Sequence, residues 1–93
     1  MRVIGLKIIE DFVEQHADVR NQLYAWVGEA RDANWETPNE IKARYASASF
    51  LDDNRVIFNI KGVKYRLEVK VNYKNQIVLV KRLGTHAEYS KWK

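Results

Sequence analysis

The sequence predicts an α+β domain, with two N-terminal helices packed on one face of an antiparallel β-sheet. Two observations support this prediction. Apolar residues recur at helical spacing in the first third of the chain, and from Arg55 onward they alternate with a period of two. Helical segments followed by a run of strands are typical of α+β folds. Because the 93 residues contain no linker, internal repeat or low-complexity segment, we expect one domain over residues 1–93.

The first third of the chain should contain a short strand and two amphipathic helices. The opening MRVIG reads as the strand, and KIIEDFVEQH carries a first apolar stripe of Ile8, Ile9, Phe12 and Val13. Asp18 is expected to cap a second helix. Steps of four and three place the second stripe on Val19, Leu23, Trp26, Val27 and Ala30. Two such helices predict a hairpin that covers a sheet.

A compact helix start follows in TPNE. Thr37 is expected as the N-cap, Pro38 fits the first helical position, and Glu40 stands where a capping box needs its acid. The helix should run to about Tyr45, and ASASFLDDN then reads as a loop that ends in a polar turn.

Two strands joined by a tight turn at Lys61-Gly62 open the second half. In the first, RVIFNI, one face carries Val56, Phe58 and Ile60. In the second, GVKYRLEVKVN, the two faces separate cleanly. The apolar face should carry Val63, Tyr65, Leu67, Val69 and Val71, and the polar face Lys64, Arg66, Glu68, Lys70 and Asn72.

A third strand and a helical turn complete the chain. After a turn at YKNQ, the run IVLVKRL is apolar on both faces at first, which favours an interior strand. Gly84 is expected to end this strand. Thr85 and Glu88 have capping-box spacing and predict a final turn of helix.

The composition limits the classes of function. Apolar residues make up 46% of the chain and include three Trp, five Tyr and three Phe, so a packed core is expected. The chain has no Cys, which excludes disulfides and zinc-thiolate sites and fits a reducing compartment. It shows neither an apolar stretch of about 20 residues, as a membrane span needs, nor a signal-peptide pattern. The expected location is the cytoplasm.

The net charge of +4 is unevenly distributed. Residues 1–53 carry six Lys and Arg against ten Asp and Glu, whereas residues 54–93 carry ten against two. A one-sided cationic surface favours a polyanionic partner, most often nucleic acid. The alternative is a surface charged only for solubility, but such surfaces usually mix both signs along the chain.

Cations and proton-transfer groups are expected to meet on the open face of the sheet, opposite the helices. The alternation places Lys64, Arg66 and Lys70 there. If the last strand pairs antiparallel with this one, its far end returns towards Arg66 and brings Lys81, Arg82, His86 and Tyr89.

This set of side chains suits RNA cleavage without a metal. A base must take the proton of a 2′-OH, cations must stabilise the charge on the phosphorane, and an acid must protonate the leaving 5′-oxygen. Histidine suits either proton role, and an arginine fork binds two phosphate oxygens. A tyrosine can stack on a nucleobase, or act as the base where nearby cations lower its pKa.

Each residue also has a structural explanation. His86 can be a surface residue, Tyr89 can close the core, and Lys81-Arg82 can be an ordinary charge pair at a strand end; His16 follows the apolar side of the first helix and should be structural. The four glycines form no nucleotide-binding loop, so no nucleotide cofactor is expected. A metal is not expected either, because the basic region offers as ligands only Glu68, His86 and Glu88.

Three stretches, MRVI, TPNEIKARYASASFLDDNRVIFNIKGVKYRLEVKVNY and GTHAEY, resemble the HigB family of bacterial type II toxins. This family lies in the RelE-like group of ribosome-dependent mRNA interferases. The resemblance covers nearly the whole chain. It implies a RelE-like fold, with a helical hairpin on a curved antiparallel sheet and a short C-terminal helix. It further implies mRNA cleavage in the ribosomal A site, in the bacterial cytoplasm, and neutralisation by a helix-turn-helix antitoxin of the HigA type. DNA would be bound only through the complex with that antitoxin.

The resemblance also implies a catalytic set. Its arginine on the strand matching KYRLEVKV, its basic or His residue after the last strand and its terminal aromatic residue fall on Arg66, His86 and Tyr89. The expected RNA-binding residues are Lys64, Lys70, Lys81, Arg82 and Lys91.

One position departs from the family pattern, because Ser90 stands where an Asp is expected after GTHAEY. Two alternatives to the active toxin remain open. One is a non-catalytic RNA- or ribosome-binding module that uses the same cationic sheet, and the other, to which the departure at Ser90 points, is a degenerate toxin kept as an antitoxin-binding partner. Which of His86 and Tyr89 acts as the base is open as well.

Overall fold

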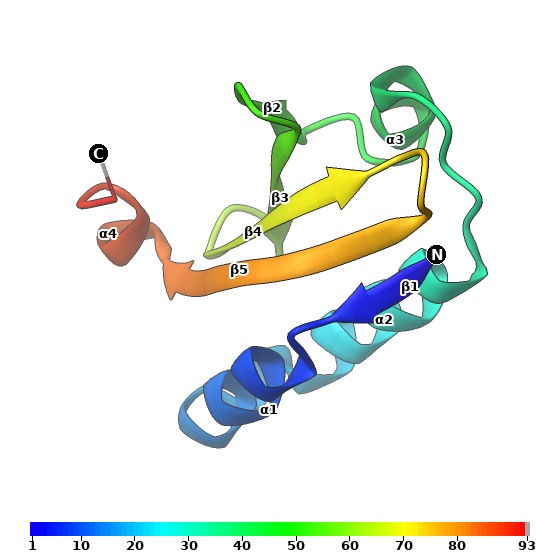
Figure 1. Ribbon diagram of the computed structural model, residues 1–93. Coiled ribbons are helices and arrows are strands. Elements are labelled where there is room, and N and C mark those ends of the chain that lie inside the picture. The colour runs from blue at the N-terminus through cyan, green and yellow to red at the C-terminus, as the bar shows by residue number, and fades with distance from the viewer. Residues whose placement is uncertain (93) are drawn as a thin grey trace.

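The α+β prediction is confirmed by a computed structural model, which describes residues 1–92 and packs helices against a five-stranded mixed sheet (Figure 1). The strand order is β1-β5-β4-β3-β2. The strands are β1 (Arg2–Ile4), β2 (Ser49–Phe50), β3 (Arg55–Ile60), β4 (Tyr65–Asn72) and β5 (Ile77–Thr85). The helices are α1 (Leu6–Gln15), α2 (Arg20–Asp32), α3 (Pro38–Arg44) and α4 (His86–Tyr89), with a 3-10 turn, η1, at Ala17–Val19.

Helices α1 and α2 cover one face of the sheet, while α4 follows β5 at one end of it (Figure 1). The expected apolar stripes make the helix–sheet contact. Ile9 and Val13 of α1 are buried, and so are all five residues of the second stripe, Val19, Leu23, Trp26, Val27 and Ala30. The opposite face of the sheet carries polar side chains together with the apolar Ile57.

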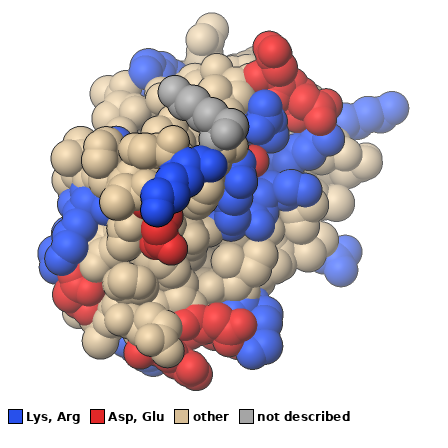
Figure 2. Space-filling model, turned by 90° about the vertical axis from the view of Figure 1, so that its left-hand side faces the viewer, with Lys and Arg blue, Asp and Glu red and all other residues tan. Residues whose placement is uncertain are grey.

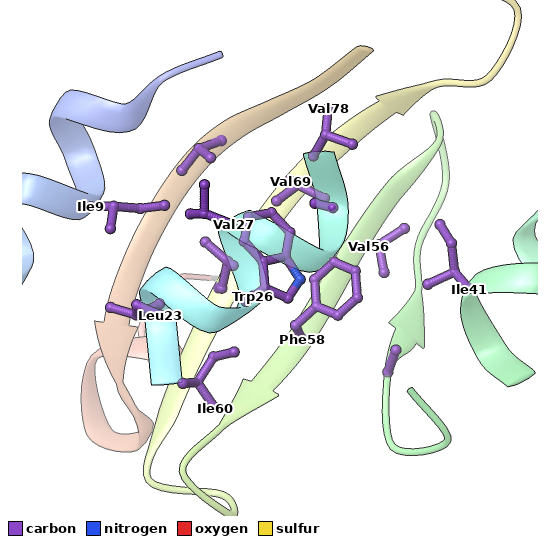
Figure 3. Close-up of a cluster of buried hydrophobic side chains, with 14 of the residues drawn as sticks. Ile9, Leu23, Trp26, Val27, Ile41, Val56, Phe58, Ile60, Val69 and Val78 are labelled. Carbon is purple, nitrogen blue, oxygen red and sulfur yellow. The ribbon is translucent and has the colours of Figure 1, made fainter. Parts of the chain in front are cut away.

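Trp26 lies in the middle of the core, between α2 and the sheet (Figure 3). Its indole meets the Phe58 ring edge-on, with 5.3 Å between the ring centroids. Ile41 of α3 adds to the same cluster beside Val56 (Figure 3). Close packing of this kind fixes the backbones of the strands. The side chains on the other face of the sheet therefore project from a rigid support.

The sheet differs from the expected antiparallel meander at its two edges. Strands β3, β4 and β5 pair antiparallel, but β1 pairs parallel with β5, with Val3 beside Val78. At the other edge, β2 pairs antiparallel with β3 within the stretch expected to be a loop. A two-residue strand shows no alternation, and the pairing of β1 joins opposite ends of the chain, so neither leaves a local signal.

The turn between β3 and β4 is longer than expected. It spans residues 61–64, and φ is positive at both Lys61 and Gly62, at 55° and 68°. β4 consequently begins at Tyr65. Val63, which was expected on the buried face, is 65% exposed. From β4 onward the predicted apolar face is buried, and its members are Tyr65, Leu67, Val69 and Val71.

Both predicted capping boxes are present. The Thr37 hydroxyl accepts a bond from the Glu40 N–H, and the Glu40 carboxylate accepts one from the Thr37 N–H. Thr85 and Glu88 make the same pair of bonds at the start of α4. Each box satisfies N–H groups that a helix start otherwise leaves unpaired. A four-residue helix can therefore form directly at the end of β5.

Candidate active site

The open face of the sheet, opposite α1 and α2, carries charged residues of β3, β4 and β5. Antiparallel pairing sets Arg66 beside Gly84 and Glu68 beside Arg82. On the end of the molecule that carries α4, Lys and Arg side chains gather in one area with acidic side chains around it (Figure 2). The candidate site lies where α4 meets this open face.

A β-bulge decides which β5 residues reach the open face. Val69 pairs with Val80, but the preceding residue, Glu68, pairs with Arg82, so Lys81 is an extra residue in the strand. Val80 is buried in the core, and strict alternation would send Arg82 to the same side. The bulge reverses the alternation and places Arg82 on the open face.

The structure brings Arg66, His86 and Tyr89 together. The guanidinium nitrogen Nη2 of Arg66 lies 3.0 Å from Nδ1 of His86. The guanidinium carbon lies 5.2 Å from the centre of the Tyr89 ring, within the range of a cation–π contact. His86 is exposed, and the other two are half-buried. A cation thus touches both candidate proton-transfer groups at a surface open to solvent.

The Arg66 contact selects one form of the His86 ring. A guanidinium group can only donate hydrogen bonds, so Nδ1 of His86 must accept. The neutral ring then carries its proton on Nε2. Nδ1 of His86 is therefore occupied by the Arg66 guanidinium.

Backbone carbonyls of the β3–β4 turn hold this pair. Nη1 of Arg66 donates to the Val63 carbonyl at 2.6 Å, and the His86 N–H donates to the Lys64 carbonyl at 3.0 Å. The Ser90 hydroxyl donates to the His86 carbonyl at 3.1 Å. Both the N–H and the carbonyl of His86 are therefore hydrogen-bonded, and Ser90 is the C-cap of α4.

Asp18 ties the same turn to the helical layer. Its carboxylate accepts bonds from Nζ of Lys64 at 2.9 Å, Nζ of Lys61 at 3.0 Å and the Tyr65 hydroxyl at 2.9 Å. These bonds hold the pKa of the Asp18 carboxyl well below its usual range. The prediction that Asp18 caps α2 is wrong, because α2 has no side-chain cap and three donors engage this carboxylate. Lys64 is likewise paired with the helical layer rather than grouped with Arg66.

Asp18→Asn is expected to destabilise the protein at neutral pH and to reduce its sensitivity to acid. A carboxyl with a lowered pKa in the folded state stabilises the fold above its ordinary pKa, near 3.8, and that contribution is lost as the pH falls below this value. The free energy of unfolding, measured with urea at pH 7 and pH 3, should therefore fall more on acidification in the wild type than in the variant.

Asp11→Asn provides the matched control. Asp11 forms an exposed ion pair with Lys7 within α1 and makes no bond to the turn, and such pairs contribute little. The free energy of unfolding of Asp11→Asn should fall between pH 7 and pH 3 by the same amount as that of the wild type. An equal loss on acidification in the wild type and in Asp18→Asn would contradict the assignment.

A second charged group surrounds Glu68, beside the Arg66 site. The Glu68 side chain is only 5% exposed; Oε1 accepts from Nε of Arg82 at 2.9 Å, and Oε2 lies 3.7 Å from Nη1 of Arg55. On its other side, the Arg82 guanidinium lies 4.2 Å from the centre of the Trp92 ring. The two arginines offset the desolvation cost of the buried Glu68 carboxylate. Arg82 is consequently held between a carboxylate and an aromatic ring.

The sequence prediction did not include Trp92 among the site residues. The one sequence feature that could have indicated it is Gly84, a glycine within β5. A Cβ on Gly84 would lie 2.9 Å from Cζ2 of Trp92 and 3.1 Å from Cβ of Glu88. Gly84 was expected to end the strand, but β5 continues through Thr85. A glycine inside a strand often marks the close approach of another group. Here it lets Trp92 and α4 lie directly on the sheet.

Gly84→Ala is expected to displace Trp92 and α4 from the sheet. The added methyl group would lie within 3.1 Å of two of their atoms, and overpacking of this kind typically costs about 1–3 kcal/mol of stability. Because α4 carries His86 and Tyr89, the RNA cleavage that the sequence predicts for this site should fall along with stability. The measurements are the urea midpoint and, for the folded variant, the rate of that predicted cleavage.

Gly28→Ala is the control for this substitution. Gly28 lies within α2, with no atom within 4 Å of an added Cβ, and alanine in a helix is favoured over glycine by about 0.5–1 kcal/mol. This variant should gain stability and keep full activity. Wild-type stability and activity in Gly84→Ala would show that Trp92 does not pack closely on residue 84.

The other expected RNA-binding residues are spread around the open face. Nζ of Lys70 lies 3.0 Å from a carboxylate oxygen of Asp53. Lys81 is exposed at the bulge, and Lys91 is exposed after α4. These three lysines are dispersed over the surface and do not cluster at the Arg66–His86 pair.

Residues 1–92 lack two further classes of feature. No three His, Cys, Asp or Glu side chains of this part of the chain lie close enough to hold a metal ion. Its helices also fall short of the length and apolar character that a membrane crossing requires.

Comparison with protein families identifies the chain. The family model HigB_toxin, described as the RelE-like toxic component of a toxin-antitoxin system, matches residues 19–92. Comparison with curated proteins gives no match. The matched span includes β3 to β5 and all of α4, and with them every residue of the candidate site. Because the match covers most of the chain, this protein belongs to the HigB toxin family, the RelE-like toxic component of a system whose other component is an antitoxin.

Proposed function

We propose that this protein is an endoribonuclease that cleaves mRNA in the A site of the translating ribosome, by attack of a 2′-OH on the adjacent phosphate. One observation carries the proposal: the Arg66 guanidinium contacts the His86 imidazole at 3.0 Å and lies over the Tyr89 ring. Family membership supports it, since the matched span contains all three residues. A HigA-type antitoxin in the bacterial cytoplasm would neutralise the toxin.

The resting contact between Arg66 and His86 suggests how substrate starts the reaction. A guanidinium binds a phosphate through charge-assisted, bidentate hydrogen bonds, which are stronger than its bond to a neutral imidazole. A phosphate at the site therefore draws Arg66 away from Nδ1 of His86. The freed nitrogen can take the proton of the 2′-OH, while Arg66 stabilises the charge that develops on the phosphorane.

Tyr89 positions the scissile nucleotide by stacking, and the surrounding cations hold the RNA backbone. Attack by the 2′-oxygen breaks the bond to the 5′-oxygen, which takes up a proton and leaves as a hydroxyl. The other product carries a 2′,3′-cyclic phosphate. So small a set of groups requires an oriented substrate, and a codon held by the ribosome supplies that orientation.

The test adds the purified protein to bacterial ribosomes programmed with a defined message. New 5′-hydroxyl ends should map to the A-site codon, with 2′,3′-cyclic phosphates on the upstream fragments. A message with a 2′-O-methyl group at the cleaved residue should stay intact, because it has no 2′-OH to attack. The same message without ribosomes should be cut far more slowly.

The other outcomes point to the rival functions. Binding to programmed ribosomes without cleavage would favour a non-catalytic ribosome-binding module. Absence of both binding and cleavage, from protein shown to be folded, would favour a degenerate toxin that serves only as an antitoxin partner. Cleavage of the 2′-O-methyl message would contradict the proposed attack by the 2′-OH.

A further inference from the structure

A pocket adjoins the Arg66–His86 pair through Tyr89, which lines the pocket and contacts the Arg66 guanidinium. It has a volume of about 270 Å³ and is lined by Leu51, Arg55, Ile57, Glu68, Arg82, Tyr89 and Trp92. Its walls come from the loop before β3, the open face of the sheet and the chain around α4. We propose that this pocket holds a nucleobase of the bound RNA, next to the phosphate at Arg66. The inference rests on the proposed RNA-cleaving function and deepens it.

The charges of the pocket favour a neutral ring over a phosphate. Glu68 presents a carboxylate that is already bonded to Arg82 and lies 3.7 Å from Arg55. A phosphate that entered would meet this nearly buried anion, and repulsion between two anions in a partly desolvated site is costly. A nucleobase carries no charge. Its N–H groups can donate to the free lone pairs of the carboxylate, and its carbonyl or ring nitrogens can accept from the arginines.

The shape and the lining of the pocket also suit a flat ring. Leu51 of the loop before β3 and Ile57 of the sheet are the aliphatic lining residues, and the Tyr89 and Trp92 rings meet edge-on, with 5.4 Å between their centroids. Proteins that bind single-stranded RNA use such aromatic side chains as stacking surfaces, with arginine planes beside them. Leu51 is 40% exposed although it is large and apolar, so it is available to a ligand.

Tyr89 couples this pocket to the reacting groups. Its ring lines the pocket and also lies beneath the Arg66 guanidinium, which contacts His86. A nucleobase in the pocket would therefore fix its own nucleotide with the attached phosphate close to Arg66. The pocket residues Trp92, Glu68 and Leu51 are then specificity and positioning residues for the cleavage reaction.

The experiment measures binding to ribosomes programmed with a non-cleavable, 2′-O-methyl A-site codon. Each codon nucleotide is replaced in turn by an abasic residue, and the Kd of the protein is measured for wild type, Trp92→Ala and Leu51→Ala. Loss of the base that enters the pocket should weaken wild-type binding about 5- to 150-fold, the range that base–aromatic stacking contributes. The same abasic message should cost the two variants much less, because their pocket wall is already removed.

Ile4→Ala is the matched control, since Ile4 is a large apolar side chain that is 39% exposed on β1, outside the pocket. The Kd of Ile4→Ala should rise with the abasic message by the same factor as that of the wild type. Leu51 lies outside α4, so Leu51→Ala keeps the test valid if Trp92→Ala disturbs the C-terminal turn. Equal abasic penalties in the wild type and in Leu51→Ala, or no penalty at any codon position, would overturn the proposal.

The experiment also separates this inference from the proposed function. Base-dependent binding by a protein that never cleaves the unmodified message would support the pocket and refute the nuclease. Cleavage of the unmodified message, with no abasic penalty that depends on Leu51, would support the nuclease and refute the pocket.

Discussion

Arg66→Ala is expected to lower the rate of ribosome-dependent mRNA cleavage by about 100- to 1,000-fold, equivalent to roughly 2.7–4 kcal/mol of transition-state stabilisation. In the folded protein its guanidinium reaches both His86 and the Tyr89 ring, and no other cation makes both contacts among the described residues. Part of the loss should appear as weaker binding, because Arg66 already binds the phosphate before reaction, and the larger part in kcat, because further charge develops on the phosphorane in the transition state. The measurement is single-turnover cleavage on programmed ribosomes.

Two further variants define the role of Arg66. Arg66→Lys keeps the charge without the planar fork, so it should recover only part of the activity. Arg20→Ala removes the same charge from α2, in the helical layer on the opposite side of the sheet, and should leave cleavage within a few-fold of wild type. A wild-type rate in Arg66→Ala, from folded protein, would remove Arg66 from the mechanism.

The arrangement of Arg66, His86 and Tyr89 is largely predictable because each depends on a local pattern. The period-two alternation of β4 determines which way Arg66 points. The capping box of Thr85 and Glu88 predicts where the terminal helix begins, and antiparallel pairing of β4 with β5 brings that helix back to Arg66. Local rules are therefore sufficient where the position of a side chain depends only on the alternation or cap of its own element and on which strand pairs with it.

Other features of the site depend on contacts that no local pattern indicates. The bulge at Lys81 changes the face on which Arg82 lies, and strict alternation from Val80 gives the wrong side. The cations near a site can also be engaged elsewhere, as Lys64 is by Asp18, 46 residues away in the chain. Trp92 returns onto Gly84 through tertiary packing alone. Alternation predicts the direction of a side chain but not its partner.

The family resemblance and the structure contribute different kinds of information. Sequence motifs such as GTHAEY identify the family, and the family model matches the same region. The structure adds the hydrogen-bonding state of the site, in which Nδ1 of His86 is occupied by Arg66. It also accounts for Ser90, whose hydroxyl bonds the His86 carbonyl. This is a local bond to the carbonyl four residues earlier, within the turn of α4 that carries His86 and Tyr89.

His86→Ala is expected to lower the cleavage rate by about 100- to 10,000-fold, the range for loss of a positioned general base or acid. His86→Asn separates proton transfer from positioning. An asparagine can still accept a hydrogen bond from Arg66, but it cannot take up a proton at neutral pH. If His86 transfers a proton, both variants should be equally impaired, and added imidazole should restore part of the activity of His86→Ala. If His86 only holds Arg66 in place, His86→Asn should retain activity within about tenfold of the wild type. Because Arg66 leaves Nδ1 for the phosphate in the proposed mechanism, we expect the first pattern, with binding to programmed ribosomes nearly unchanged in both variants.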